Sequence, residues 1–109
     1  MYIARWHFTA REGQTDGCVA LLRKWVIDVG ERIGWKLSTI RVTRGAIGVS
    51  EGEIQIEVQL DSLSDLEGAW NDMKSVPYHQ QYLKDLEPVL VAGSLRWTVH
   101  RVVDLTPND

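Results

Sequence analysis

The sequence predicts an α+β protein in which helices cover one face of a four-stranded antiparallel sheet. Four short segments alternate apolar and polar residues, as half-buried strands do, and two longer segments repeat apolar residues every three or four positions, as amphipathic helices do. Their order along the chain is β-α-β-β-α-β. A chain of 109 residues can bury one hydrophobic core and is too short for two. We therefore expect a single domain at residues 1–105, followed by a C-terminal tail at 106–109.

Each expected strand has one apolar and one polar face. The pattern is strict at residues 53–60, where the even-numbered positions are apolar and the odd-numbered ones are acidic or amide residues. The same alternation recurs at residues 2–9, with even-numbered positions apolar, and at 94–103, with odd-numbered positions apolar, and it is weaker at 39–44. A glycine-containing segment, residues 45–52, is suited to a hairpin loop. Helices can cover the apolar face of such a sheet, whereas the polar face must meet water, a ligand or a second subunit.

The first helix is expected after a turn at residues 11–14, with Thr15 or Asp16 as its N-cap. Its apolar stripe has spacings of three and four residues and consists of Val19, Leu22, Val26, Val29 and Ile33. We expect this helix to end at Gly34.

The second helix is expected in two parts. Ser64 and Glu67 have the spacing of a capping box, and proline at position 77 disfavours helical geometry in the residue before it. Tyr82 and Leu86 then continue at helical spacing. The first part carries a short apolar stripe made of Leu66, Ala69, Trp70 and Met73.

The order β-α-β-β-α-β is that of the ferredoxin-like fold. Right-handed crossovers favour the strand order 4-1-3-2, with both helices on the apolar face of the sheet.

Composition excludes several classes of protein. The chain is 44% hydrophobic and 25% charged, with a net charge of −3, which does not favour a nucleic acid partner. It has no apolar run of the roughly 20 residues needed to cross a bilayer and no signal-peptide pattern at its N-terminus. The single cysteine, Cys18, cannot form an internal disulfide and is interpreted as a small helix residue, which suits a cytoplasmic location.

Four polar residues are expected to gather on the uncovered sheet face: Arg5, His7, Glu57 and His100. If the strands pair end to end, Arg5 lies between Glu57 and His100, and His7 lies between Gln55 and Thr98. One interpretation is a polar lumen in which a histidine exchanges protons near neutral pH. The other is a cross-strand ion pair that forms part of a dimer interface, and it is favoured because structural ion pairs often imitate sites. We expect no metal site, since the histidines lack ligand spacing.

Aromatic residues are expected between the sheet and the helices. Trp6 and Trp97 project from strands toward the helices that carry Trp25 and Trp70, and three further residues follow on the second helix: Tyr78, His79 and Tyr82. These rings could simply form the core. Alternatively, they could wall a cleft suited to a flat ligand, with His79 at its edge.

The segment from Trp70 to Leu83, followed by Leu86–Leu90 and a final strand, resembles the second half of dimeric α/β-barrel proteins of the antibiotic-biosynthesis monooxygenase type. This resemblance implies a homodimer in which two ferredoxin-like sheets meet through their uncovered faces. Activities known in that superfamily include cofactor-independent oxygenation of polycyclic aromatics, haem degradation, and isomerase or decarboxylase chemistry. Many of its members have no known activity.

For the monooxygenase branch, the resemblance implies that a hydroxylated aromatic binds in the cleft and reacts with oxygen as its anion, without a cofactor. The walls would be Trp6, Trp70 and Trp97, and Tyr78 would border the cleft. His79 or Tyr82 would bind the substrate oxygen.

The haem-degrading branch has an asparagine on the first strand and a tryptophan and axial histidine on the second helix. Trp70 and His79 are similar in type and spacing. However, His7 stands where the asparagine is expected, and Pro77 interrupts the helix, so haem is a minor alternative.

Two non-enzymatic functions are also compatible with this order of strands and helices. A non-catalytic dimeric module that binds a small ligand or a partner protein would have the same fold, because fold alone does not decide function. An RNA-recognition domain shares the topology but needs aromatic residues on the uncovered faces of the first and third strands. Here the third strand presents glutamates and glutamines, which do not favour phosphate.

Overall fold

The computed structural model describes residues 1–107; residues 108–109, the end of the expected tail, lie outside the described part. Its strands are β1 (Tyr2–Thr9), β2 (Ile40–Arg44), β3 (Glu53–Leu60) and β4 (Arg96–Arg101). Its α-helices are α1 (Thr15–Asp28), α2 (Leu63–Ser75) and α3 (Pro77–Leu86). Two short 3-10 turns, η1 (Gly30–Ile33) and η2 (Glu87–Val89), follow α1 and α3.

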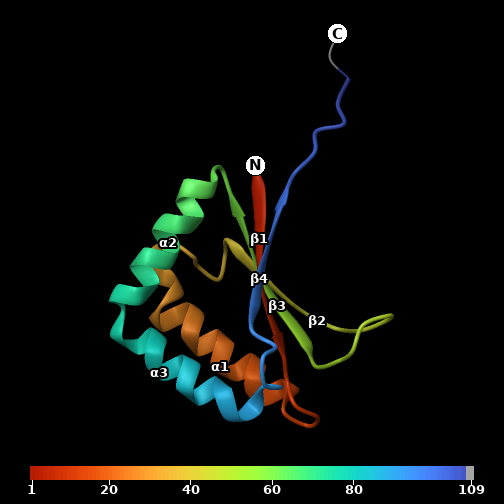
Figure 1. The fold of residues 1–109 in the computed structure, drawn as a ribbon, viewed down its shortest axis with the longest axis vertical. Helices are drawn as coiled ribbons and strands as arrows, with labels where there is room; N and C mark the ends of the chain where they lie inside the picture. Colours follow the sequence, from red (N-terminus) through yellow and green to blue (C-terminus); the bar gives the residue numbers. More distant parts are fainter. Residues whose placement is uncertain (108–109) are drawn as a thin grey trace.

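The four strands form one sheet in the order β2-β3-β1-β4, with all three pairings antiparallel. This is the expected order 4-1-3-2 counted from the other edge. The three helices lie together on one side of the sheet, and the other side is uncovered (Figure 1). The predicted ferredoxin-like α+β fold is therefore confirmed.

The register of the sheet differs from the expected one at β4. Between β1 and β3 it is as expected, with Arg5 opposite Glu57. Between β1 and β4 it is shifted by two residues, so that Arg5 lies opposite Thr98. A turn around Gly93, whose φ is 76°, places the start of β4 at Arg96. A shift of two residues preserves the face on which every side chain lies.

Both expected N-caps are wrong. The cap of α1 is Gln14, because its carbonyl already accepts the first helical hydrogen bond, from Cys18 N–H at 2.9 Å, and Thr15 is buried in the first turn. The cap of α2 is Ser62, which has the extended backbone that a cap needs and accepts a hydrogen bond from Asp65 N–H at 3.3 Å. The sequence around Ser62 has the same spacing as the expected capping box at Ser64.

The helix ends follow the sequence signals more closely. The α-helical part of the first helix ends at Asp28, and the 3-10 turn η1 continues it to Gly34, where a φ of 87° stops the helical path. α2 ends at Ser75, and Pro77 occupies the first turn of α3, where its missing N–H costs little. The expected division of the second helix at Pro77 is confirmed.

The core lies between the sheet and the helices. Its largest fully buried side chains come from both layers and include Trp25, Phe8, Leu22, Ile54, Ile56 and Leu86. Cys18 is also fully buried, and burial raises the pKa of its thiol to about 11, which keeps it protonated and unreactive. Within the described residues, every helix is too short or too polar to cross a membrane.

Candidate functional site

All five tryptophans join in one aromatic cluster between the sheet and the helices. Trp6 stacks on Trp97 with the ring centroids 5.3 Å apart and the planes 6° apart, and it meets Trp25 edge-on at 5.2 Å. Trp35 lies within 6.3 Å of Trp25 and 5.9 Å of Trp97. The sequence reasoning assigned no role to Trp35, because it lies in the turn after the first helix, where periodicity carries no signal.

Burial decreases from one end of this cluster to the other. Trp25, Trp6 and Trp35 are buried, Trp97 is half-buried, and Trp70 is 36% exposed. Trp97 keeps some exposure because it stands on β4, an edge strand. The inner rings therefore fill the space between sheet and helices, and Trp70, which meets Trp97 edge-on at 5.6 Å, is the end that reaches solvent.

His79 is part of the buried end. Its side chain is 8% exposed, and its Nδ1 lies 3.0 Å from Nε1 of Trp25. An indole N–H can only donate, so Nδ1 must accept, and the neutral ring carries its proton on Nε2. Burial also lowers the pKa of His79 below its usual range. At neutral pH His79 is thus an uncharged imidazole whose Nδ1 is already used.

The two tyrosines of α3 contact α1 and the 3-10 turn η1 that follows it. The Tyr82 hydroxyl donates to the carboxylate of Asp28, and this bond raises the pKa of Tyr82 to about 12. Tyr78 is exposed, with the guanidinium of Arg32 lying 5.4 Å from its ring centre. The structure therefore brings Trp6, Trp97 and Trp70 together with His79, while Tyr78 and Tyr82 are engaged with Arg32 and Asp28.

A groove of about 440 Å³, which we call the Trp70 groove, opens beside the exposed end of the cluster. Its lining is Leu63, Leu66, Glu67, Trp70, Asn71, Lys74 and Val99. All but Val99 come from α2, at the spacing of one helix face. The sequence reasoning identified Trp70 but missed Asn71 and Lys74, although Asn71 follows Glu67 and Lys74 follows Trp70 by the four residues of one helix face.

Glu57 organises the uncovered face of the sheet. Its carboxylate accepts from Arg5 Nε at 3.0 Å and, through the other oxygen, from Arg41 Nε at 2.9 Å. These bonds, with that from Arg41 the larger influence, hold the pKa of Glu57 below its usual range despite partial burial. The predicted pairing of Arg5 with Glu57 is present, and Arg41, which sequence reasoning did not single out, completes it.

The two strand histidines extend this polar group along β1 and β4. Arg5 Nη1 lies 3.1 Å from His100 Nδ1, and His7 Nε2 lies 2.7 Å from the Thr98 hydroxyl. Both contacts are diagonal in the observed register, which is why the shift of two residues did not separate them. Burial, followed by the charge of Arg96, lowers the pKa of His7.

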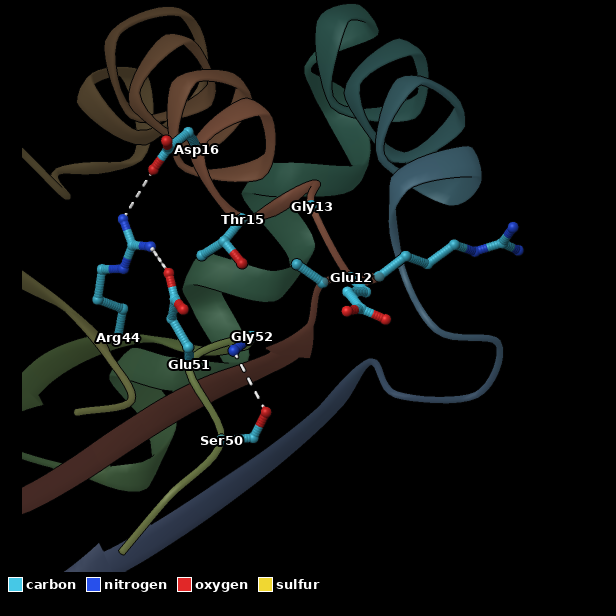
Figure 2. Close-up of a pocket in the computed structure, with 10 residues that line it drawn as sticks. Glu12, Gly13, Thr15, Asp16, Arg44, Ser50, Glu51 and Gly52 are labelled. Atoms are coloured by element: carbon cyan, nitrogen blue, oxygen red, sulfur yellow. Dashed lines mark hydrogen bonds and ion pairs between the residues drawn. The ribbon is translucent and has the colours of Figure 1, made fainter. Parts of the chain in front are cut away.

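A second depression, of about 450 Å³, lies where the loop before α1 meets the β2–β3 loop (Figure 2). There Arg44 donates to Asp16 at 2.9 Å and to Glu51 at 2.7 Å. The positive charge of Arg44 is thus paired with two carboxylates of the same chain. We interpret this cluster as a tie between the β2–β3 loop and α1, and none of the residues singled out from the sequence for a site lies in it.

Comparisons with known proteins bear on the fold. No family model and no curated protein matches the sequence. Among solved structures, a NIPSNAP family protein from Agrobacterium tumefaciens matches with a TM-score of 0.76 at 16% identity, over 97% of this chain and 96% of that one. An uncharacterised NIPSNAP-like domain protein from Burkholderia xenovorans matches with a TM-score of 0.77 at 13% identity, over 98% and 89% of the two chains.

The "putative antibiotic biosynthesis monooxygenase" from Chloroflexus aurantiacus matches with a TM-score of 0.61 at 17% identity, over 97% of this chain and 96% of that one. The expected resemblance to proteins of this type is therefore confirmed, and the likeness to NIPSNAP proteins adds to it. At these identities the likeness concerns the fold alone, which is the ferredoxin-like fold.

Proposed function

We propose that this protein is a homodimeric small-molecule-binding protein and that its ligand is a flat, partly hydroxylated aromatic compound held in the Trp70 groove. The observation that carries the proposal is the exposure of Trp70 at the end of an otherwise packed aromatic cluster.

The chemistry of the groove suits such a ligand. Trp70 offers an aromatic surface for stacking, and Leu63 and Val99 add exposed apolar surface to the lining. Lys74 and Asn71 supply N–H donors that can bind a hydroxyl or phenolate oxygen. An apolar hollow with a few polar groups is the usual form of a small-molecule site.

The uncovered sheet face supports the homodimer. Glu57 is already paired with Arg5 and Arg41, and His7 is already bonded to Thr98. A second sheet can therefore cover the centre of this face without leaving the carboxylate of Glu57 buried and unpaired, which would be a large cost of such an interface. Light scattering at micromolar concentration should give twice the chain mass, and a monomer mass would remove this part of the proposal.

Ligand binding is tested by titrating the protein with a panel of polyphenols and quinols while following tryptophan fluorescence. Replacing Trp70 with Leu should weaken binding of any hit at least about tenfold, because the stacking surface is lost. The matched control is Tyr78→Leu, which removes an exposed aromatic ring from α3 outside the groove. Equal binding by the wild type and Trp70→Leu, or no binding by the wild type, would contradict the proposed site.

The second candidate is cofactor-independent oxygenation of the same ligand. It is favoured by the Lys74 ammonium in the groove, which can stabilise a phenolate, the form of the substrate that reduces oxygen. One oxygen atom would enter the product as a quinone, and the other would leave as water with the hydroxyl and ring hydrogens. Oxygen uptake in the presence of a chelator, lost in Lys74→Met, supports this candidate; binding without uptake leaves the binding function.

The sequence-based roles of His79 and Tyr82 belong to this second candidate. His79 is hydrogen-bonded to Trp25, and Tyr82 is hydrogen-bonded to Asp28. Neither side chain can therefore accept a proton from a substrate while its hydrogen bond is in place. If either acts on substrate, its hydrogen bond must first open. Loss of oxygen uptake in His79→Gln or Tyr82→Phe, with ligand binding unchanged, would support that role.

The donor set does not fit haem. Axial ligation requires a lone pair on Nε2 of His79, but the Trp25 N–H places the ring proton there by occupying Nδ1. Moving the proton to Nδ1 would set two N–H groups against each other. We therefore expect no Soret shift when haem is added to the protein.

A further inference from the structure

We propose that a second binding site lies on another face of α2, between this helix and the segment that joins η1 to β2, and that it binds a small hydroxylated amine. The parts of this site are two carboxylates, one indole N–H and a glycine that leaves the space beside them open. The site is separate from the Trp70 groove and does not depend on the function proposed above.

The space is a hollow of about 510 Å³, which we call the α2 hollow. Its lining comes from residues 33–39, from the end of β3 and from α2. The α2 residues include Asp65, Gly68, Ala69 and Asp72, whose spacings of three and four residues are those of one helix face. The Trp70 groove is lined by a different face of the same helix. A hollow of this volume is in the usual range for a small-molecule site.

The lining carries two negative charges and no positive one. Asp65 and Asp72 line the hollow, and no residue of the lining is lysine, arginine or histidine. In the part of the chain that the structure describes, the ion pairs use other carboxylates, so neither aspartate is neutralised by a basic side chain. Asp72 stands in the last turn of α2, where the helix dipole disfavours an acidic residue. Helix stability therefore does not explain Asp72, and the hollow favours a positively charged ligand.

The indole N–H of Trp35 also lacks a partner. The Trp35 side chain is 4% exposed and packs against Trp25 and Trp97, and its Nε1 donates to no acceptor among the described residues. None of the fully enclosed side-chain nitrogens and oxygens of those residues lacks a hydrogen bond, so Nε1 must keep contact with open space. The α2 hollow is the space that Trp35 lines. Because an indole N–H can only donate, the ligand should offer it an oxygen.

Two other polar side chains of the lining are already bonded within the chain. The Thr39 hydroxyl donates to the carbonyl of Lys36 at 3.2 Å, and the Ser64 hydroxyl lies 2.9 Å from that of Ser62. The groups left for a ligand are thus the two carboxylates, which accept, and the Trp35 N–H, which donates. An ammonium group and a hydroxyl oxygen complement them, whereas a carboxylic acid would be repelled and a plain alkylamine would leave the N–H unpaired.

Gly68 keeps the hollow open between the two aspartates. It lies in the middle of α2, where every residue except proline forms a helix more readily than glycine does. A Cβ at this position would meet no atom within 4 Å, and Gly68 is not among the glycines with positive φ. Neither crowding nor backbone conformation therefore requires a glycine here. A larger side chain would instead fill space that the ligand needs.

The first experiment follows the signals of the five indole N–H groups by NMR while a probe is added. The probes are glucosamine and 1,3-diamino-2-propanol, at a pH where their amines are protonated. We expect the sequentially assigned Trp35 signal to shift more than the other four. Glucose lacks the ammonium group and cyclohexylamine lacks the hydroxyls, so each should bind at least about fivefold more weakly than glucosamine. A Trp35 signal that neither probe shifts, or equal binding of glucose or cyclohexylamine, overturns the inference.

The second experiment removes the charges. Asp65→Asn combined with Asp72→Asn should raise the dissociation constant of the probe at least about tenfold, because the ammonium group loses both carboxylates. The matched control is Asp85→Asn combined with Glu87→Gln, which removes two exposed carboxylates outside the hollow. Equal binding by the wild type and the Asp65, Asp72 variant contradicts the site.

The third experiment fills the hollow. Gly68→Leu should abolish probe binding while the free energy of unfolding stays the same or rises, because leucine forms a helix more readily and meets no neighbour. Gly17→Leu is the control, since Gly17 is an exposed glycine of α1 whose Cβ would also meet no close neighbour. Trp70→Leu should leave probe binding unchanged, which separates this site from the Trp70 groove. Binding that survives Gly68→Leu, or that is lost in Trp70→Leu, overturns the inference.

Discussion

The hydrogen bond between Trp25 and His79 decides what the only histidine on a helix can do. It fixes the neutral ring with its proton on Nε2 and joins α1 to α3 through side chains 54 positions apart. Protonating Nδ1 would break this bond, so both the bond and burial oppose a positive charge on the ring. The residue that sequence alone placed at the edge of a cleft is therefore a buried, uncharged connection between helices.

We expect the free energy of unfolding to fall between pH 7 and pH 5, and to fall less in His79→Gln. Because the pKa of folded His79 is lowered from 6.5, the unfolded chain binds the proton first as the pH drops through 6.5. The stability that uncharged His79 contributes is thus fully present above that pH and is lost as the pH falls below it. Urea unfolding at both pH values measures the difference, and His7→Gln is the comparison because the pKa of His7 is also lowered. Equal losses in wild type and His79→Gln would refute this assignment.

Trp6 and Trp70 should differ sharply in their contribution to stability. Trp6 is buried against Phe8, Trp25 and Trp97, so Trp6→Ala should cost about 3 to 5 kcal/mol. Trp70 is 36% exposed, and Trp70→Ala should cost less than about 2 kcal/mol. Urea denaturation checks both values. A cost for Trp70 equal to that for Trp6 would mean that Trp70 belongs to the core rather than to a binding surface.

Among the secondary structure elements, α2 has its N-cap two residues before the position that the capping-box pattern predicted. Ser62 caps the helix, and Ser64 lies within its first turn. Ser62→Ala should therefore destabilise the protein by about 1 kcal/mol. Ser64→Ala, the matched control, should change stability by less than about 0.5 kcal/mol. Thermal or urea unfolding of the two variants tests the cap, and a larger effect at Ser64 would restore the expected capping box.

The pairing of β1 with β3 is marked by Arg5 and Glu57. A double-mutant cycle with Arg5→Met and Glu57→Gln should give a coupling of about 0.5 to 1 kcal/mol, since both side chains are partly buried. The control cycle uses Arg44 and Asp16, whose carboxylate is almost fully exposed and whose coupling should be near zero. Additive effects at Arg5 and Glu57 would show that their contact does not stabilise the sheet.

For the whole molecule, the proposed homodimer couples folding to association. The urea midpoint should then rise with protein concentration, because mass action favours a folded dimer over unfolded chains. Unfolding followed by circular dichroism over a hundredfold range of concentration gives the measurement. A midpoint independent of concentration would indicate a monomer that folds by itself.

The sequence by itself determined the class of each element and its order along the chain. Strand parity at residues 53–60 and the helix break at Pro77 are local: one depends on the two-residue repeat of a strand, the other on the proline ring. These repeats also placed Arg5 and Glu57 on the same face of the sheet, because any even shift in register keeps both there, and the end-to-end pairing of β1 with β3 then set them opposite each other.

Tertiary structure decided the features that depend on residues far apart in the chain. The register of β4 depends on where the turn at Gly93 ends, and the N-cap of α2 depends on the residue at which β3 ends. Trp35 joins the aromatic cluster and His79 becomes buried because helices pack on the sheet, which no periodicity describes. Side-chain spacing repeats along a single element, whereas exposure and hydrogen-bond partners are set by how elements meet. That difference is why the fold was predictable from the sequence, while the packing of the aromatic rings and the opening beside Trp70 were not.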